Sequence, residues 1–355
     1  MIPVTKTRNS SFELLRILSM LMIVLVHAND ASIGAPVRAD VLSAPYASMW
    51  RILAQQICTC AVNVFVLISG WFGIKASVKG LCSLLFQVFF WGIAVVALGW
   101  AFHLEIPLAK TAQVLWFGSY YWFIIAYVGL YVLTPLLNSF IDKASKTQML
   151  TLLICFFTVE FVYGWLVSSG SFHRGFSILS FVGLYLLARY IRLYGVRLSS
   201  LSVYIFLLSY ALATLIPACL SFVGIRNGWK PLHTGYYSSP FVIAAAVSLL
   251  LAFSKKAFHS KVVNYLASGV FSVYLIHEHS VVRPYFRSFM RGLYAHLSPY
   301  EYTVVVFLLA LVFVLLCPLL DSLRRSAWKW CCSRFLDRGI ATFEKWYGRT
   351  VEKIA

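Results

Sequence analysis

The stretch FELLRILSMLMIVLVHAN, residues 12–29, decides how this chain folds. It is an apolar segment of membrane-spanning length, and two ionisable side chains, Arg16 and His27, interrupt it with ten residues between them. Eleven helical steps of about 100° bring both side chains to one face, about 16 Å apart along the axis. Because ionisable groups are costly in lipid, this face is expected to line a protein-enclosed cavity. The alternative is that Arg16 is an interfacial anchor and that His27 only ends the helix.

The composition places the whole chain among membrane proteins. Hydrophobic residues make up 61% of the 355 residues and charged residues 12%, against about a quarter charged in soluble domains. Apolar segments of spanning length predict an all-α polytopic protein with about ten transmembrane helices. The expected spans are residues 12–31, 50–72, 81–103, 120–141, 146–167, 175–192, 199–221, 236–253, 264–281 and 301–323.

The net charge of +18 follows the predicted topology. No basic block is interleaved with base-stacking aromatic residues in a soluble segment, so a nucleic-acid partner is not expected. Ten spans put both termini on one side, which carries twenty Lys and Arg residues against nine on the other. The positive-inside rule therefore predicts a plasma (inner) membrane protein with both termini in the cytoplasm. Residues 10–323 are expected to form the membrane domain and residues 324–355 a basic amphipathic tail on the inner membrane surface.

A few other polar residues lie at predicted membrane depth. Glu13 is expected either to pair with the guanidinium of the first span or to complement the helix dipole. Glu160 is expected to face a cavity or a basic partner, unless it marks a span boundary. His277 and His279 flank Glu278 near the outer end of the ninth span, where imidazole can transfer protons. No HExxH or comparable spacing occurs, and no metal site is predicted.

Small and aromatic residues mark two further candidate positions. Ser69 and Gly70 allow the close approach of a backbone or of a ligand, and simple helix packing is the alternative. Trp116 and Trp122 belong to an aromatic cluster at the outer end of the fourth span. Such a cluster either stacks on sugar rings or forms an interfacial belt.

Five segments, in their order along the chain, resemble the acyltransferase-3 family of bacterial integral-membrane acyltransferases. The Arg and His of the first segment match the signature opening of that family, and NVFVLISGWF resembles its Ser-Gly element. Many relatives carry an arginine-rich patch after this element, where the present chain has only Lys75 and Lys79. The resemblance covers about residues 10–323. The segments are FELLRILSMLMIVLVH (12–27), NVFVLISGWF (63–72), YYWFIIAYVGLYVLTPLLN (120–138), GFSILSFVGLYLLARYIR (175–192) and SVYLIHEH (272–279).

The resemblance implies acyl transfer, usually of acetyl, from cytoplasmic coenzyme A to a hydroxyl of a cell-surface carbohydrate or its lipid-linked precursor. Acetyl-coenzyme A is then a co-substrate, and no permanently bound cofactor is expected. Arg16, with Lys75 and Lys79, is expected to bind the donor phosphates. His27 is expected either to act as general base or to carry the acyl group itself. Because no hydrolase-like domain is appended, partner proteins of a polysaccharide pathway are expected.

Arg283, Arg287 and Arg291 recur every four residues in the last outer loop and would form one stripe on a helix. Like charges at this spacing disfavour an isolated helix, which suggests an anionic partner. The stripe is expected to hold the phosphate or acidic sugars of the acceptor, or else to be a solvated surface that touches lipid headgroups.

A second function class is a transporter or flippase of a glycan or its lipid carrier. In that case Arg16 and His27 would line the transport path. No internal repeat is detectable, although many transporters have one, and this favours the enzyme.

Overall fold

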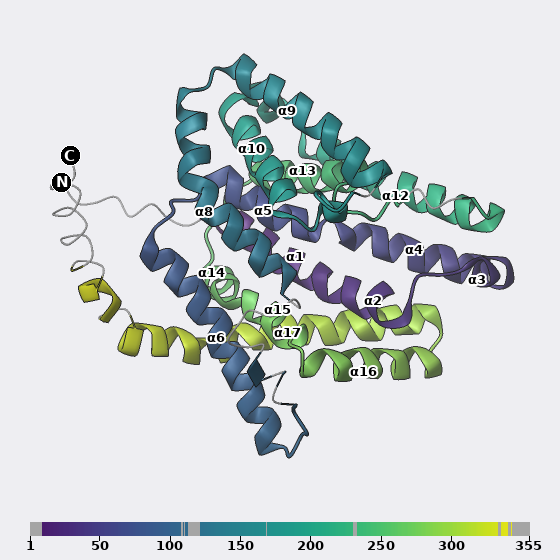
Figure 1. Cartoon of the computed structure of the whole chain (residues 1–355). Coiled ribbons are helices and arrows are strands. Elements are labelled where there is room, and N and C mark those ends of the chain that lie inside the picture. Colours follow the sequence, from purple (N-terminus) through teal and green to yellow (C-terminus); the bar gives the residue numbers. More distant parts are fainter. Residues whose placement is uncertain are drawn as a thin grey trace.

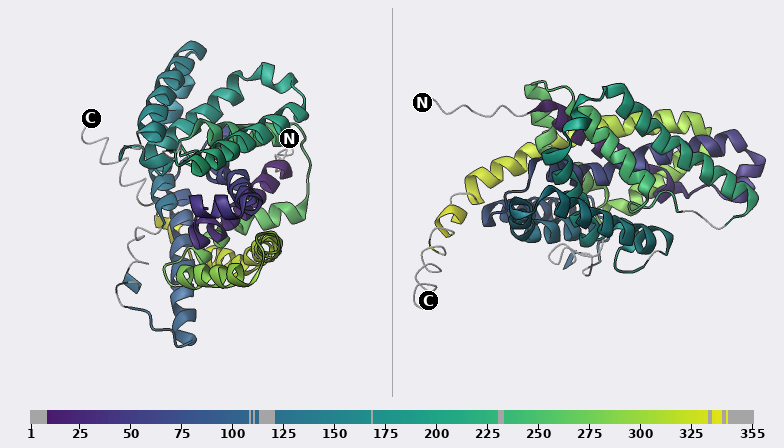
Figure 2. Two further views of the ribbon diagram at one scale, coloured as in Figure 1. Left: turned by 90° about the vertical axis from the view of Figure 1, so that its right-hand side faces the viewer. Right: turned by 90° about the horizontal axis from the view of Figure 1, so that it is seen from above.

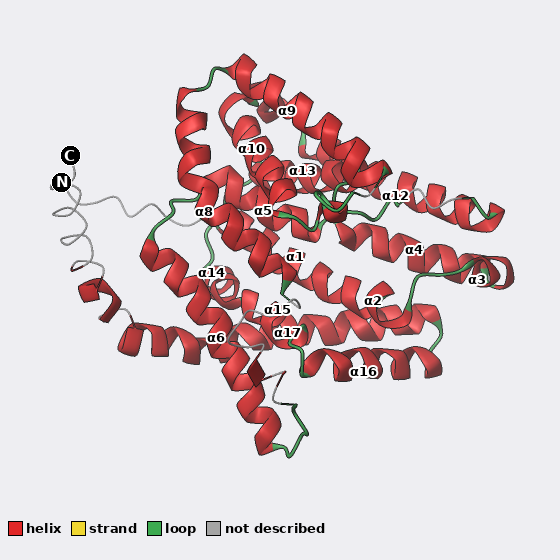
Figure 3. Cartoon of the chain, viewed as in Figure 1, coloured by secondary structure: helices red, strands yellow, loops and turns green. Residues whose placement is uncertain are grey.

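Helices make up almost all of the computed structural model, which describes residues 9–107, 109, 111–112, 121–167, 169–229, 233–332, 335–339 and 342. Within these residues there is no β-strand (Figure 3). The first half of the chain contains α1 (Ser10–Ala28), α2 (Asp30–Ile33), α3 (Arg38–Ser43), α4 (Pro45–Thr59), α5 (Ala61–Phe72), α6 (Val78–Ala101), α8 (Trp122–Lys143), α9 (Lys146–Glu160) and a π-helix (Phe161–Leu166). The second half contains a 3-10 turn (His173–Gly175), α10 (Ile178–Tyr194), α11 (Val196–Ser200), α12 (Val203–Asn227), α13 (Pro240–Ser254), α14 (Lys261–Gly269), α15 (Phe271–His277), α16 (Val282–His296), α17 (Pro299–Ala327) and a second π-helix (Trp328–Cys332).

Seven helical stretches of the described chain are long and apolar enough to cross a membrane. The other three predicted spans are shorter helices, namely α10, α13 and the broken pair α14–α15. The all-α polytopic fold is thereby confirmed, while the count of about ten spans stays a prediction. The seven stretches are Ser10–Ile33, Pro45–Phe72, Val78–Ala101, Trp122–Lys143, Lys146–Leu166, Val203–Asn227 and Pro299–Trp330.

Helix α1 occupies the middle of the bundle (Figure 1). It packs against α4, α5, α13, α14 and α17, and apolar side chains such as Leu15, Met20 and Val24 are buried along it. By contrast, the far end of α6 projects beyond the neighbouring helices (Figures 1 and 2). A helix enclosed by protein can carry ionisable residues at membrane depth, which explains why Arg16 and His27 are tolerated on α1.

Gly70 is required for the packing of α5 on α10. A Cβ atom at this position would lie 2.6 Å from the carbonyl oxygen of Tyr185 and 2.8 Å from the Cβ of Ala188. Both distances are shorter than atoms tolerate, so any side chain would push the helices apart. The small residue therefore serves helix approach, one of the alternatives that the sequence left open.

Helices α15, α16 and α17 arrange the chain around the C-terminal end of α1. Helix α15 ends at His277, and after a short turn α16 runs beside α17 and contacts α2 (Figure 1). At the other end of α17, Asp321 is fully buried and accepts hydrogen bonds from Arg324 at 2.8 and 2.7 Å and from the Trp91 indole at 2.9 Å. The helix thus continues past the expected domain boundary at residue 323.

Candidate active site

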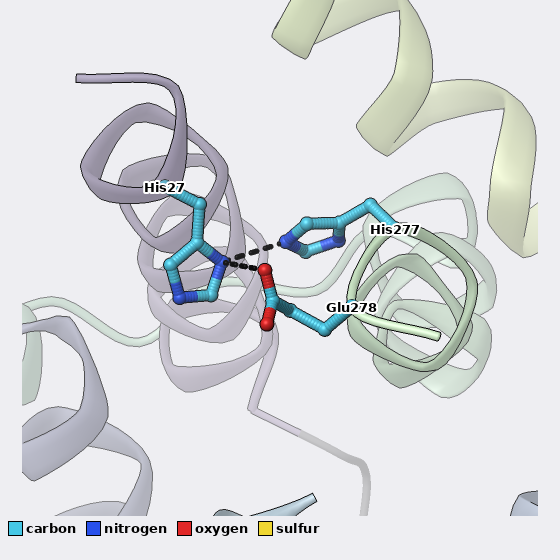
Figure 4. A group of neighbouring side chains, drawn as sticks. All are labelled: His27, His277 and Glu278. Atoms are coloured by element: carbon cyan, nitrogen blue, oxygen red, sulfur yellow. Dashed lines mark hydrogen bonds and ion pairs between the residues drawn. The ribbon is translucent and has the colours of Figure 1, made fainter. Parts of the chain in front are cut away.

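Two histidines from distant parts of the chain form the centre of the candidate site. His27 lies in the last turn of α1 and His277 ends α15, with Nδ1 of His27 2.8 Å from Nε2 of His277. Glu278 places its Oε1 atom 3.5 Å from the same Nδ1 atom (Figure 4). His277 and Glu278 are buried, and the His27 side chain is 18% exposed.

The hydrogen bonds of this pair indicate which nitrogen carries each proton. Nδ1 of His277 lies 2.6 Å from the carbonyl oxygen of Val273, which can only accept, so this nitrogen carries the hydrogen. In a neutral imidazole Nε2 is then an acceptor, and Nδ1 of His27 must donate to it. This assignment leaves Nε2 of His27 with a free lone pair. Figure 4 shows that nitrogen on the side of the ring away from His277 and Glu278.

Glu278 adds negative charge beside His27. Its Oε1 atom is buried and makes no hydrogen bond within the described structure, while Oε2 lies 3.8 Å from the guanidinium of Arg283 on α16. If His27 takes a second proton, the carboxylate stabilises the imidazolium by Coulomb attraction. The cluster is thus a base with a defined tautomer and a stabilised charged form.

His27 also lines a small cavity of about 20 Å³. This volume has room for about one water molecule, so an acyl group can enter only if the surrounding rings move. Tyr274 lines the same cavity, and its hydroxyl is buried and makes no hydrogen bond of good geometry within the described structure. A movement of the surrounding rings would expose this hydroxyl as a donor to a reacting oxygen. The aromatic residues of the wall are Phe65, Trp122, Phe123, Tyr237, Phe271 and Tyr274.

A second cavity, of about 240 Å³, surrounds Arg16. Arg16 pairs with Glu13 at 2.5 Å, as one of the alternatives from the sequence predicted, and its side chain is 26% exposed. Ser69 lines the same cavity, and its hydroxyl lies 3.1 Å from that of Tyr127. Gln87 contributes a buried amide nitrogen without a hydrogen-bond partner in the described residues. The cavity thus offers a cation and several polar groups to a ligand.

Three phenylalanines, Phe65, Phe123 and Phe271, line both cavities and so form the partition between them. The ring centroid of Phe123 lies 6.5 Å from that of Phe65 and 6.0 Å from that of Phe271. Arg16 and His27, one from each cavity, are about 16 Å apart along α1. Aromatic rings therefore separate the cavity that holds the cation from the cavity that holds the imidazole.

Comparison with known protein families identifies this helical bundle. The acyltransferase domain that defines the acyltransferase-3 family matches residues 9–321, nearly the whole chain. The chain belongs to the acyltransferase-3 family. No curated protein and no solved structure matches it. The resemblance in the sequence is thereby confirmed, and the protein is a multi-pass membrane acyltransferase.

The two lysines that were expected to bind the donor lie outside the Arg16 cavity of this acyltransferase. Lys75 and Lys79 are exposed, and Lys79 forms an ion pair of 2.6 Å with Asp337. Neither side chain lines the cavity around Arg16. Their role in donor binding stays a prediction.

Of the residues expected to bind the acceptor or to support the site, Trp122 lies in the wall of the His27 cavity. Its ring contacts Phe176 at a centroid distance of 4.4 Å, so it belongs to the protein interior. Trp116 lies outside the described residues. Glu160 is buried beside Ser180 and lines neither of the two cavities.

The arginine stripe is carried by a helix, α16, and its residues point toward different partners. Arg283 lies near Glu278, and Arg291 donates to the carbonyl oxygen of Ser32 on α2 at 3.4 Å. Arg287, between them, has a buried Nε without a hydrogen-bond partner in the described structure. The stripe thus lies close to His27 and Glu278, and binding of the acceptor by it stays a prediction.

The sequence assigned no role to three residues that the structure places at or near the site, namely Tyr274, Glu278 and Arg189. Tyr274 lies three residues before His277, and Glu278 directly follows it, within SVYLIHEH. Their closeness to this histidine in the sequence is the feature that could have pointed to them. Helical periodicity would not place residues 277 and 278 on one face, but α15 ends at His277 and the turn lets both side chains reach His27. Arg189 lies beside Gly73 at the end of α5, with a buried, unpartnered Nε among the described residues.

His27, His277 and Glu278 also form a group that could hold a metal ion, since one ligand atom from each lies within 4.8 Å of the others. In the described structure the two imidazoles share a hydrogen bond through these same nitrogens. Metal binding would have to displace that proton. The expectation of a metal-free enzyme remains a prediction.

Proposed function

We propose that this acyltransferase moves an acetyl group from cytoplasmic acetyl-coenzyme A to a hydroxyl of a cell-surface carbohydrate or lipid-linked glycan precursor. The observation that carries the proposal is the 2.8 Å contact of Nδ1 of His27 with Nε2 of His277, which leaves a free lone pair on Nε2 of His27. The His27 ring lines a small cavity next to the cavity of Arg16. The family supports acyl transfer, and the geometry supports a base with a path toward a cation.

The donor enters from the side of Arg16. A guanidinium is well suited to the phosphates of coenzyme A, and Arg16 is exposed to a cavity large enough to admit part of the donor. The pantetheine arm then passes the partition of three phenylalanines and delivers the thioester to His27. The separation of about 16 Å along α1 is a span that an extended arm of this kind can bridge.

Transfer follows from the arrangement around His27. Its Nε2 takes the proton of the acceptor hydroxyl while the oxygen attacks the thioester carbonyl carbon, and Glu278 stabilises the imidazolium that forms. The Tyr274 hydroxyl donates to the oxyanion of the tetrahedral intermediate. The C–S bond then breaks, and the thiolate of coenzyme A takes the proton from the imidazolium. The ester stays on the carbohydrate, and His27 returns to its starting tautomer.

In this proposal the acceptor and the donor bind from opposite sides of the membrane. Cysteines introduced near Pro36 and Gly228 should react with an impermeant reagent in intact cells, whereas those near Ser77 and Ser145 should not. Labelling of the second pair would overturn the assignment of the donor side to the cytoplasm.

The test of function compares surface glycans from cells that carry wild-type protein, His27→Ala or no protein. Mass spectrometry should find acetylated glycans only with the wild-type protein. His27→Ala should abolish turnover because proton transfer contributes about 10²–10⁴-fold, while leaving donor binding intact. The matched control is His259→Ala, an exposed histidine on the loop before α14. Wild-type acetylation by well-folded His27→Ala would refute the mechanism.

A further inference from the structure

A polar cavity of about 380 Å³ lies beside the site and has no part in the mechanism above. Residues from α2, α4, the end of α12 and the segment 233–236 line it. Asp30, three residues after His27, is one of them. Tyr236 lines this cavity and the next residue, Tyr237, lines the cavity of His27. This polar cavity is therefore next to the cavity of His27.

The groups in its wall are those that recognise sugar hydroxyls. Nε2 of Gln56 donates to Oγ1 of Thr234 at 2.9 Å, and that hydroxyl lies 2.7 Å from Oγ of Ser221. Gln55 accepts a hydrogen bond from Asn29 at 3.2 Å, which leaves the two N–H donors of its amide for a ligand. Amides and hydroxyls that both donate and accept match the paired donor and acceptor character of a sugar hydroxyl.

Asp30 has an unsatisfied hydrogen-bond acceptor. Its Oδ1 atom is buried and has no hydrogen-bond partner in the described residues. A buried carboxylate oxygen without a donor is destabilising, so such atoms usually have partners. A turn of the Asp30 side chain toward the cavity would let a ligand hydroxyl supply the missing donor.

Trp229 offers an aromatic surface at the mouth of the cavity. Its backbone N–H bonds to the carbonyl oxygen of Gly224 at 2.9 Å, and its side chain is held near that glycine at the end of α12. Trp229 remains 56% exposed, whereas the ring of Tyr236 is already stacked on His233 with centroids 4.4 Å apart. The indole is therefore the ring in this wall that can stack on an apolar face of a ligand.

Asp30 carries the formal charge of the cavity wall at neutral pH. Burial and the nearby Arg174 lower the pKa of His233 below its ordinary value, which keeps that imidazole neutral. Two guanidinium groups lie near this wall, Arg51 beside Asp30 and Arg174 over the ring of Tyr236 at 4.9 Å, but neither lines the cavity. An acidic sugar in the cavity would therefore meet the carboxylate of Asp30 directly and be repelled by it.

We propose that this cavity binds an uncharged pyranose unit of the acceptor glycan. The inference deepens the proposed function and rests on it, because the bound unit would present a neighbouring hydroxyl to His27. The volume is typical of small-molecule sites, which span about 300–1,000 Å³.

Saturation-transfer NMR on the full-length protein tests this directly, in an amine-oxide detergent that carries no sugar. The probes are methyl β-glucoside, methyl β-galactoside, methyl N-acetyl-β-glucosaminide and methyl β-glucuronide. At least one neutral glycoside should bind, and the glucuronide should bind more weakly. Trp229→Ala should weaken the neutral glycoside about tenfold, which corresponds to about 1.4 kcal/mol. Asp30→Asn should improve binding of the glucuronide relative to the neutral glycoside.

Trp100→Ala is the matched control, because Trp100 is also 56% exposed and lies near the end of α6. Its glycoside binding should equal that of the wild type. Failure of all three neutral glycosides to bind, or equal affinities for Trp229→Ala and Trp100→Ala, would overturn the inference.

The same samples distinguish this inference from the proposed function through their hydrolysis of acetyl-coenzyme A. If the protein hydrolyses acetyl-coenzyme A but shows no glycoside binding that Trp229→Ala weakens, the sugar cavity is refuted and the acyl-transfer proposal stands. Glycoside binding without any turnover refutes the donor chemistry instead.

Discussion

Replacing Glu278 with Gln should slow catalysis without disturbing the fold, because the two side chains have nearly the same shape. The carboxylate Oε1 atom lies 3.5 Å from Nδ1 of His27. At an effective dielectric constant of about 20, opposite unit charges at this distance attract by about 5 kcal/mol. The guanidinium of Arg283, 3.8 Å from the other carboxylate oxygen, and partial exposure of His27 reduce this figure to about 3–4 kcal/mol.

Since about 1.4 kcal/mol corresponds to a tenfold change in rate, kcat should fall by about 10²–10³. The assay is release of coenzyme A from acetyl-coenzyme A by purified protein, with the KM of the donor measured in parallel. That KM should stay at the wild-type value, since Glu278 contacts His27, which lies about 16 Å from Arg16 along α1. Glu105→Gln, at an exposed carboxylate, is the control and should be neutral. A well-folded Glu278→Gln variant with wild-type kcat would show that no imidazolium forms at His27 in the rate-limiting step.

Three further outcomes follow from the described contacts. Arg16→Ala should raise the KM of acetyl-coenzyme A about tenfold or more with a smaller change in kcat, and an unchanged KM in steady-state kinetics would remove it from the donor site. Phe123→Ala should open the partition and let longer acyl donors compete with acetyl, so unaltered selectivity in a competition between acetyl- and butyryl-coenzyme A would contradict the passage. Asp321→Asn should lower the melting temperature, because Arg324 is left buried without its charge partner, a loss of about 3–5 kcal/mol; a thermal unfolding curve that matches wild type would disprove this.

The sequence predicted the class of fold and several residues that line the two cavities, namely Arg16, Ser69, His27 and Trp122. Long apolar stretches with few charges can only be buried in lipid or protein, and helices are the structure that satisfies their backbone there. The eleven-residue separation of Arg16 and His27 implied a shared face because both residues lie on one continuous helix, where rotation per residue is nearly constant.

The partners of His27 could not be predicted in the same way. His277 and Glu278 come 250 residues later, and only the packing of α15 against α1 brings them to Nδ1. Periodicity also failed locally, because the helix ends at His277 and the turn redirects the next side chain.

The sequence by itself therefore determined the membrane-embedded helical class, the family and the cation and imidazole of α1. Only the tertiary structure decided the tautomer of His27, the partition formed by three phenylalanines, and the polar cavity that includes Asp30 and Trp229. The physical reason is the distance along the chain over which each interaction acts. Hydrophobicity and helical rotation act between neighbours along the chain, whereas a hydrogen bond or a cavity wall depends on which distant helices come into contact.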